Sequence, residues 1–376
     1  MQNATSNVKS AWLTTNRSCN NNCEWCYAQN EKMRNSNMDF EKAKQMIDYL
    51  AKEGISKIVL IGGEPTIYNH FVDIIKYIRN KGICASVATN GRKFADLQFA
   101  KNTVEAGISS INISLKASSE EDYVKYTKKN GLSEMLKGYQ NLCSIGFKPV
   151  ISYVIVDDNK DEFEKVINLI ENNKIEDVIF QFVKPVIELQ KSSEIMDIKK
   201  MGQFVNYIYK RLKDVKFNYV LEVSFPLCLI DRDILDNLIN EKKILTCCHI
   251  QKGAGIIFDT DFKVLPCNHF AGFPFDNKAF DPNKDTISAL WCSNNVKKFR
   301  QKAQCYPSKV CKSCEIWNIC GGGCFTRWLY INPNDYISHT NIWERTEMHY
   351  AGNSNESLQR YRRCCSDCRW CILLYQ

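Results

Sequence analysis

Three cysteines within eight residues near the start of the chain constrain its fold and chemistry more than any other feature. They are Cys19, Cys23 and Cys26, with three residues and then two residues between successive thiols. Thiolates are strong, soft ligands for iron, and cysteines this close together on a loop can bind one face of an iron–sulfur cube. A cube has four irons, so three cysteines leave one iron free to bind a group that is not protein. A zinc knuckle is the main alternative, but zinc usually takes four sulfur or nitrogen ligands, and no fourth cysteine or histidine lies nearby.

The chain contains 19 cysteines among 376 residues, and this number bears on where the protein works. In a secreted protein it would predict disulfides. The first ten residues lack the apolar run of a signal peptide, and no stretch approaches the roughly 20 apolar residues that span a membrane. We therefore expect a cytoplasmic protein whose reduced thiols bind metal. The net charge of +8 is scattered over helical stretches, which predicts neither a nucleic-acid nor a membrane partner.

Strand-like and helix-like stretches alternate through the first half of the chain. Apolar runs predict strands at residues 11–15, 56–61, 83–88, 110–115, 148–156 and 177–183. Helical spacing of apolar residues predicts helices at 39–53, 71–80, 94–106, 119–129, 133–145 and 161–172. Asp39 is the expected N-cap of the first helix. Six strand–helix alternations predict parallel strands covered by helices, but periodicity alone does not separate a closed barrel from an open doubly wound sheet.

Short motifs follow the ends of these strands, where parallel α/β folds carry their chemistry. The second strand is followed by Gly62, Gly63, Glu64 and Pro65. The third strand ends in Thr89, Asn90 and Gly91, and Ser114 lies at the end of the fourth. Taken alone, each motif is an ordinary turn or strand end.

Together with the cysteine loop and the aromatic Tyr27 that follows it, these motifs resemble the radical S-adenosylmethionine (SAM) superfamily. The resemblance implies a partial (β/α)6 TIM-like barrel, open on one side. It also implies a [4Fe–4S] cluster on Cys19, Cys23 and Cys26, whose open iron chelates SAM and, once reduced, cleaves it to methionine and a 5′-deoxyadenosyl radical. The residues that the resemblance assigns to SAM are Tyr27, Gly62, Gly63, Glu64, Pro65, Asn90, Ser114 and Ile155.

Within this set, Glu64 is expected to bind the amino group of SAM. Val154 and Ile155 are candidates for packing on its adenine, or are simply core residues. Lys116 and Ala117, which follow Ser114 and Leu115, depart from the Ser-Leu-Asp-Gly pattern of the peptide-modifying subfamily.

A second cysteine-rich region occupies the C-terminal third of the chain. Its core has the spacing C-x2-C-x5-C-x3-C, formed by Cys311, Cys314, Cys320 and Cys324. This spacing resembles the SPASM domain, a C-terminal extension of radical SAM enzymes that carries two auxiliary [4Fe–4S] clusters. A zinc ribbon that uses Cys311 and Cys314 is the alternative.

The resemblance implies a ligand set for each auxiliary cluster. The first cluster is assigned to Cys248 or Cys247, with Cys267 and Cys324. Its fourth ligand is open, with Cys247, Cys292 and Cys305 as candidates. The second cluster is assigned to Cys311, Cys314 and Cys320, closed by one of Cys364, Cys365, Cys368 and Cys371. Three other thiols have no such role: Cys84 and Cys143 are expected in the core, and Cys228 is isolated.

The expected domains are a radical SAM core barrel over 1–183, a bridging region over 184–246 and a SPASM domain over 247–376. In the bridging region, helices are expected at 196–213 and 229–243, with a strand at 219–223 between them. Phe262 occupies a position where the SPASM pattern has glycine.

SPASM enzymes mostly modify ribosomally made peptides, so the resemblance implies an oxidoreductase of the RiPP maturase type. The expected reaction is a crosslink, an oxidation or an epimerisation, with three [4Fe–4S] clusters and SAM as cofactors. The expected partners are the peptide and an electron donor such as flavodoxin or ferredoxin. Only 18 residues precede Cys19, too few for the leader-binding winged-helix domain of many members. Three alternatives follow: a separate leader-binding protein is a partner, the leader binds the barrel or the aromatic-rich stretch between Cys324 and Cys364, or the substrate is not a leader peptide.

Two alternatives remain for the function. One is a radical SAM enzyme that oxidises a small molecule, such as a sugar or a cofactor precursor. The other is a non-catalytic iron–sulfur electron carrier, which would have no use for a SAM pocket. The sulfatase-oxidising branch is disfavoured because Asn268 replaces the aspartate after Cys267. His269 is the candidate acid or base, or a hydrogen-bonded histidine beside the cluster.

Overall fold

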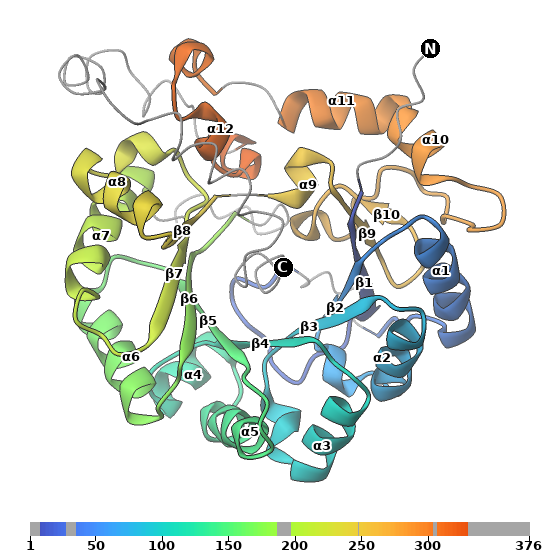
Figure 1. Cartoon of the computed structure of the whole chain (residues 1–376), viewed down its shortest axis with the longest axis horizontal. Coiled ribbons are helices and arrows are strands. Elements are labelled where there is room, and N and C mark those ends of the chain that lie inside the picture. The colour runs from blue at the N-terminus through green and yellow to red at the C-terminus, as the bar shows by residue number, and fades with distance from the viewer. Residues whose placement is uncertain (1–7, 28–34, 186–196, 247, 304–306, 330–376) are drawn as a thin grey trace.

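A ten-stranded sheet organises the computed structural model, which describes residues 8–27, 35–185, 197–246, 248–303 and 307–329. The sheet curves around an interior, and helices cover its outer face (Figure 1). The strand order is β10-β9-β1-β2-β3-β4-β5-β6-β7-β8. Every neighbouring pair is parallel except β9 with β10. The expected α/β fold with a parallel, barrel-like sheet is confirmed.

The strands predicted from the sequence, which correspond to β1 to β7, begin and end within a few residues of their expected bounds. The strands are β1 (Ser10–Asn16), β2 (Lys57–Gly62), β3 (Cys84–Thr89), β4 (Ser110–Leu115), β5 (Val150–Ile155), β6 (Asp177–Phe182), β7 (Asn218–Glu222), β8 (Ile244–Leu245), β9 (Gly255–Phe258) and β10 (Val264–Leu265).

The helices connect successive strands or follow the sheet in the C-terminal part of the chain. They are α1 (Phe40–Lys52), α2 (Phe71–Asn80), α3 (Leu97–Glu105), α4 (Glu120–Thr127), α5 (Leu132–Ser144), α6 (Lys160–Asn172), α7 (Ile198–Arg211), α8 (Arg232–Asn240), α9 (His249–Lys252), α10 (Ile287–Cys292), α11 (Asn294–Ala303) and α12 (Trp317–Cys320). No helix in the described ranges combines the length and apolar character needed to cross a membrane.

The first helix illustrates why these segments fold as predicted. Asp39 is its N-cap, and the Asp39 carboxylate accepts a hydrogen bond of 2.8 Å from the backbone N–H of Lys42. Such a cap contributes about 1 kcal/mol. The apolar residues at helical spacing are buried against the sheet: Ala43, Met46, Ile47 and Leu50.

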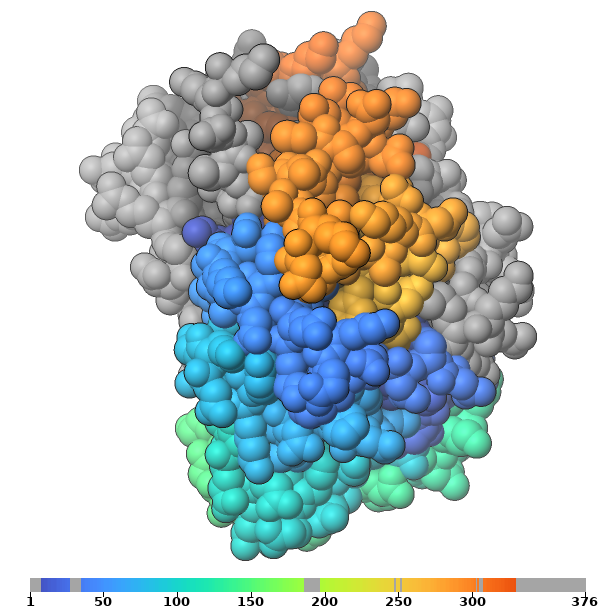
Figure 2. Space-filling model, turned by 90° about the vertical axis from the view of Figure 1, so that its right-hand side faces the viewer, coloured from blue at the N-terminus to red at the C-terminus, as the bar shows by residue number. Residues whose placement is uncertain are grey.

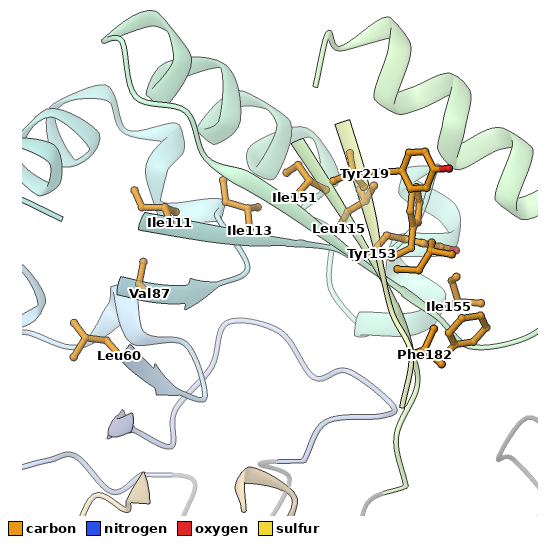
Figure 3. Packing of buried hydrophobic residues seen from close by; sticks show 14 of the residues in the cluster. Leu60, Val87, Ile111, Ile113, Leu115, Ile151, Tyr153, Ile155, Phe182 and Tyr219 are labelled. Carbon is orange, nitrogen blue, oxygen red and sulfur yellow. The ribbon is translucent and has the colours of Figure 1, made fainter. Parts of the chain in front are cut away.

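Alternate residues of the strands serve two different environments. Outward-facing residues such as Val87, Ile113 and Ile151 pack in the layer between sheet and helices (Figure 3). Inward-facing residues form a small apolar floor that contains Trp12 and Val59. Polar pairs lie on the same inner face, where the Ser110 and Ser86 hydroxyls are 2.7 Å apart and the Ser152 hydroxyl lies 2.6 Å from the Asn112 side-chain oxygen. The inner face of the sheet therefore carries polar groups, while the apolar core lies between the outer face and the helices.

The predicted bridging region and C-terminal region both contribute strands to this sheet. β7 pairs with β6, β8 pairs with β7, and β9 pairs with β1 on the other side. The segment around α10 packs against α1 (Figure 2): the Ile287 N–H donates to the Tyr49 hydroxyl at 2.9 Å, and the Tyr49 and Phe280 rings lie 5.4 Å apart. All three predicted domains thus contribute strands to one sheet, and the domain boundaries between them stay predictions.

A buried ion pair joins β1 to the end of β9. Arg17 donates from Nε and Nη2 to the two carboxylate oxygens of Asp259, at 3.0 and 2.6 Å. Both side chains are almost completely excluded from solvent, with exposed fractions of 2% and 3%. Because Cys19 follows Arg17 by two residues, this pair fixes the entry to the cysteine loop.

The fold contradicts the expectation for two cysteines and explains the conformation at Phe262. Cys84 and Cys143 are exposed rather than buried in the core, because Cys84 is the first residue of β3 and Cys143 lies in the last turn of α5. Phe262 has a φ of 63°, in the left-handed region that favours glycine. Its position in the turn between β9 and β10 accounts for the glycine that the SPASM pattern has there.

Candidate active site

A cavity of about 530 Å³ opens at the carboxyl ends of the parallel strands. The cysteine loop forms part of its wall, and the residues after β2, β3 and β4 line it as well. The wall is completed by the ends of β6 and β7 and by Asn268 and His269, which begin a short 3-10 helix. This is the edge of a parallel α/β sheet at which ligands are expected to bind.

The cysteine loop is held in place by side chains that reach it from the segment after β3 and from α4. Arg92 donates from Nη1 to the backbone oxygen of Asn20 and to the side-chain oxygen of Asn21, each at 2.8 Å. Asn90 donates to the Asn20 side chain at 2.5 Å, and Asn21 donates to the Tyr123 hydroxyl at 2.9 Å. The loop is therefore ordered by at least four polar contacts with neighbouring elements.

The three predicted iron ligands share this cavity. Cys19, Cys23 and Cys26 all line it, and none of them forms a disulfide. The backbone N–H of Asn21 donates to the Cys19 sulfur at 3.3 Å. Burial and the nearby carboxylate of Glu64 raise the pKa of the Cys19 thiol to about 12 in the absence of metal. In the described part of the chain, no three His, Cys, Asp or Glu side chains group closely enough to hold a single metal ion.

The donor set nevertheless fits an iron–sulfur cluster. Three soft thiol donors, none of them in a disulfide, line one space from one loop. The N–H donated to the Cys19 sulfur is a contact that stabilises a thiolate ligand.

Replacing Arg92 by alanine is expected to loosen the cysteine loop and to lower the retention of its iron. The substitution removes both contacts from Nη1 to the loop, and loss of such supporting contacts typically costs 10–100-fold in metal affinity. Iron content after dialysis against a chelator measures the effect. The matched control is Glu134→Ala, which removes only the partner of Arg92 Nε at 2.6 Å on the exposed side. Equal iron loss in both variants would contradict the role of the loop contacts.

Glu64 is buried, and its carboxylate organises the turn after β2. Oε1 accepts hydrogen bonds from the Thr66 and Thr89 hydroxyls, both at 2.6 Å, and Oε2 accepts the Asn90 N–H at 2.7 Å. The side chain also lines the cavity. Gly63 lets this turn approach the cysteine loop, since a Cβ atom on it would lie 2.2 Å from the backbone oxygen of Ser18.

Most of the residues predicted to bind SAM line the same cavity, and two do not. The lining contains Tyr27, Gly62, Gly63, Glu64, Asn90 and Ser114. Pro65 is buried at the start of a 3-10 helix and lies outside the lining. Ile155 is 2% exposed and packs on the outer face of the sheet, whereas its neighbour Val154 points into the cavity. The expectation that the side chains of Pro65 and Ile155 lie in the cavity is therefore corrected.

A lysine–glutamate pair that the sequence analysis did not identify also lies in this cavity. Lys184 follows β6, Glu222 ends β7, and the Lys184 ammonium contacts the Glu222 carboxylate. Burial lowers the pKa of Lys184, but Glu222 and the thiols of Cys324 and Cys248 outweigh it and raise that pKa overall. The sequence could have indicated this pair, because both residues lie at the carboxyl ends of strands, where ligands bind in parallel sheets. It was missed because β7 was placed outside the barrel.

His269 lines the cavity beside Tyr27. The two rings are 5.7 Å apart. Burial lowers the pKa of His269 to about 3, helped by the positive charges of Lys184 and Arg327. The imidazole is therefore neutral at neutral pH and a poor proton acceptor, which favours the hydrogen-bonding role over the acid–base role.

The structure brings the C-terminal thiols together in two groups. Burial, followed by the neighbouring thiols of Cys248 and Cys324, raises the pKa of the Cys267 thiol to about 12. Cys311, Cys314 and Cys320 form the other group, around α12. The remaining candidate ligands Cys247, Cys305, Cys364, Cys365, Cys368 and Cys371 lie outside the described residues.

Comparison with family models assigns residues 13–170 to the Radical SAM superfamily. Among curated proteins, Fe-coproporphyrin III synthase of Methanosarcina barkeri is 29% identical over 217 residues, which are 57% of this chain and 53% of that protein. The chain thus spans about half the length of this relative. The 7,8-dihydro-6-hydroxymethylpterin dimethyltransferase of Methanocaldococcus jannaschii is 26% identical, with 93% of this chain and 72% of that protein covered.

Two solved structures share the fold over most of the chain. SuiB of Streptococcus suis, bound to S-adenosylmethionine, has a TM-score of 0.66 at 17% identity and covers 90% of this chain and 78% of its own. The structure of anSMEcpe with AdoMet and a peptide has a TM-score of 0.66 at 17% identity and covers 95% and 96%. At this identity the likeness concerns the fold.

Proposed function

We propose, from the match of residues 13–170 to the Radical SAM superfamily, that this chain is a radical SAM enzyme and that it modifies a ribosomally synthesised peptide by hydrogen abstraction. The single observation that carries the proposal is the shared cavity. Cys19, Cys23 and Cys26 line it, and so does His269, two residues after Cys267. A substrate bound there would lie between the two predicted iron sites.

SAM and one [4Fe–4S] cluster are the cofactors of the radical SAM family. Bound at the cluster, SAM supplies a 5′-deoxyadenosyl radical that abstracts a hydrogen atom from the substrate. The residues proposed to hold the cluster are Cys19, Cys23 and Cys26. Glu64 and Ser114 are proposed to orient SAM, because both reach the cavity from strand ends beside the cysteine loop.

We extend the proposal to two auxiliary [4Fe–4S] clusters, which would make three in total. Cys248, Cys267 and Cys324 are proposed for the first, and Cys311, Cys314 and Cys320 for the second. Such clusters supply electron acceptors, and a carbon radical that forms a new bond often has to release an electron. The proximity of Cys248 and Cys324 to Cys267 supports the first assignment.

A peptide is the first substrate class to test. SuiB has also been solved with its precursor peptide, and anSMEcpe with a bound peptide, on the fold that this chain shares. The proposed partners are a peptide, a separate leader-binding protein and an electron donor such as flavodoxin or ferredoxin. We place the enzyme in the cytoplasm, where 19 thiols would stay reduced and available to iron.

A small cofactor precursor is the second candidate substrate. The observation in its favour is that the two curated relatives carry names of porphyrin and pterin chemistry. The third alternative, a non-catalytic electron carrier, conflicts with the family domain, whose members are enzymes.

The test is anaerobic reconstitution followed by assays of iron, SAM cleavage and product mass. Three clusters predict roughly 12 iron per chain, and the enzyme should release 5′-deoxyadenosine when reduced. Co-expression with a short peptide encoded beside the gene should then change the mass of that peptide. Full iron and SAM cleavage, with no change in any candidate peptide and turnover of a porphyrin or pterin precursor, would favour the second candidate. An iron content of roughly four would contradict the auxiliary clusters.

The Lys184–Glu222 pair should tune the first auxiliary cluster in opposite directions. The reduced cluster carries one more negative charge, which a nearby cation stabilises and a nearby carboxylate destabilises. Lys184→Met is therefore expected to lower the midpoint potential by on the order of 50 mV, and Glu222→Gln to raise it by a similar amount. Redox titration followed by electron paramagnetic resonance measures both. The double variant is the control and should lie near the wild-type value, and shifts of the same sign in both single variants would contradict the assignment.

A further inference from the structure

Cys228 was isolated in the sequence, but the fold places it against the second cysteine group. It lies in a 3-10 helix, Leu227–Leu229, between β7 and α8. Burial raises the pKa of its thiol, and the thiols of Cys320, Cys311 and Cys314 raise it further, which identifies all three as its neighbours. Cys228 therefore interacts electrostatically with three thiols from a distant segment of the chain.

Backbone contacts fix this arrangement independently of any thiol charge. The N–H of Leu227 donates to the Cys320 sulfur at 3.4 Å, across 93 residues of sequence. The N–H of Cys324 donates to the backbone oxygen of Ser224 at 2.9 Å. The segment 224–228 therefore runs alongside the loop from Cys320 to Cys324.

Two further contacts make the segment rigid. Arg327 is fully buried and donates from Nε to the Ser224 backbone oxygen at 3.0 Å and from Nη2 to the Ser224 hydroxyl at 2.9 Å. On the other side, a Cβ atom on Gly323 would lie 2.6 Å from the Cα atom of Phe225, so only glycine allows this approach. The placement of Cys228 follows from close packing on both sides of the loop.

Cys228 is partly exposed, so iron can reach its thiol. A [4Fe–4S] cube needs four protein ligands when no substrate or cofactor binds it, and Cys311, Cys314 and Cys320 provide three.

We propose that Cys228 is the fourth ligand of the iron–sulfur cluster held by Cys311, Cys314 and Cys320. The inference rests on the proposed auxiliary clusters. It replaces the expectation that Cys364, Cys365, Cys368 or Cys371 closes this cluster. The β7–α8 connection of the barrel then becomes part of the cluster site, so the barrel and the C-terminal cysteine loop are joined through iron.

The first test compares the alkylation of native wild-type protein before and after anaerobic reconstitution with iron and sulfide, read by mass spectrometry of its peptides. Cys228 should react slowly with iodoacetamide in the metal-free protein, because its raised pKa leaves little thiolate, and should be protected, together with Cys311 and Cys314, in the reconstituted protein. Cys84 and Cys143 are exposed controls that should react in both states. Continued reaction of Cys228 in protein that has taken up its full iron would overturn the proposal.

The second test uses two variants in which the SAM-cluster cysteines are already replaced by alanine. Adding Cys228→Ala should remove about four iron per chain or convert the cluster to a three-iron form with its own paramagnetic signal. Replacing Cys364, Cys365, Cys368 and Cys371 together by alanine should leave the iron unchanged. Loss of the cluster in the second variant would overturn the proposal, since a C-terminal thiol would then fill the fourth position.

Failure of the underlying function is distinguishable from failure of this inference. If the auxiliary clusters do not exist, the background protein takes up almost no iron, and no C-terminal thiol is protected. If the clusters exist but Cys228 is not a ligand, the background protein takes up roughly eight iron while Cys228 stays reactive. Circular dichroism of Cys228→Ser, which changes one atom, reports whether a variant has lost its fold.

Discussion

Replacing Cys23 by alanine is expected to abolish SAM cleavage while the C-terminal iron sites survive. Cys23 lines the cavity with Cys19 and Cys26, and two thiols are too few to hold a cube that keeps one iron open. Iron should fall from roughly 12 to roughly 8 per chain, and 5′-deoxyadenosine should fall to background. Iron analysis and chromatography of the products measure the two effects on one sample.

Two matched variants separate this effect from general damage. Cys143→Ala changes an exposed thiol in the last turn of α5 and should keep both iron and cleavage. Cys267→Ala should lose about four iron and keep SAM cleavage, because the cluster proposed on Cys19, Cys23 and Cys26 stays intact. Cleavage at the wild-type rate in Cys23→Ala would refute the assignment of the loop.

Replacing Asp259 by alanine is expected to be the most destabilising single substitution outside the apolar core. The change leaves the Arg17 guanidinium buried without its bidentate partner, and an uncompensated buried charge costs about 3–5 kcal/mol. The free energy of unfolding should fall by that amount in urea denaturation followed by circular dichroism. The cysteine loop should lose order as well, because Arg17 stands two residues before Cys19.

An exposed ion pair provides the comparison. Lys148 and Glu176 are 2.6 Å apart, but their side chains are 64% and 58% exposed. Lys148→Ala should therefore cost no more than about 1 kcal/mol. A second comparison is Arg17→Met with Asp259→Leu, which removes both charges and should recover much of the loss. An equal effect of Asp259→Ala and Lys148→Ala would contradict the importance of burial.

The helices and strands of the first half were predictable because their signals are local. Asp39 caps α1 through a bond to a residue three positions away, and the buried residues of α1 recur at helical spacing. The cysteine loop and the turn at Glu64 were predictable for a related reason. Their spacing and their place after a strand are both visible along the chain.

Side-chain direction and long-range pairing were not predictable in the same way. Val154 and Ile155 are neighbours on β5, so a one-residue error exchanges the cavity for the outer core. The strand around Tyr219 was predicted, but its pairing with β6 was not, and so Lys184 and Glu222 were missed. Cys228 was missed because 93 residues separate its segment from Cys320, and only packing brings them together.

The pairing of β1 with β9 has a consequence for how the chain is made. Ser10 pairs with Gly255 and Leu13 with Phe258, so one edge of the first strand stays without its partner until the ribosome has passed residue 258. At about 5–20 residues per second this wait lasts roughly 12–50 s. An open strand edge during synthesis is a site for aggregation, which a chaperone would have to cover. Arg17 also meets Asp259 only at that point, so the cysteine loop is completed late, and iron delivery has to follow translation of the C-terminal segment.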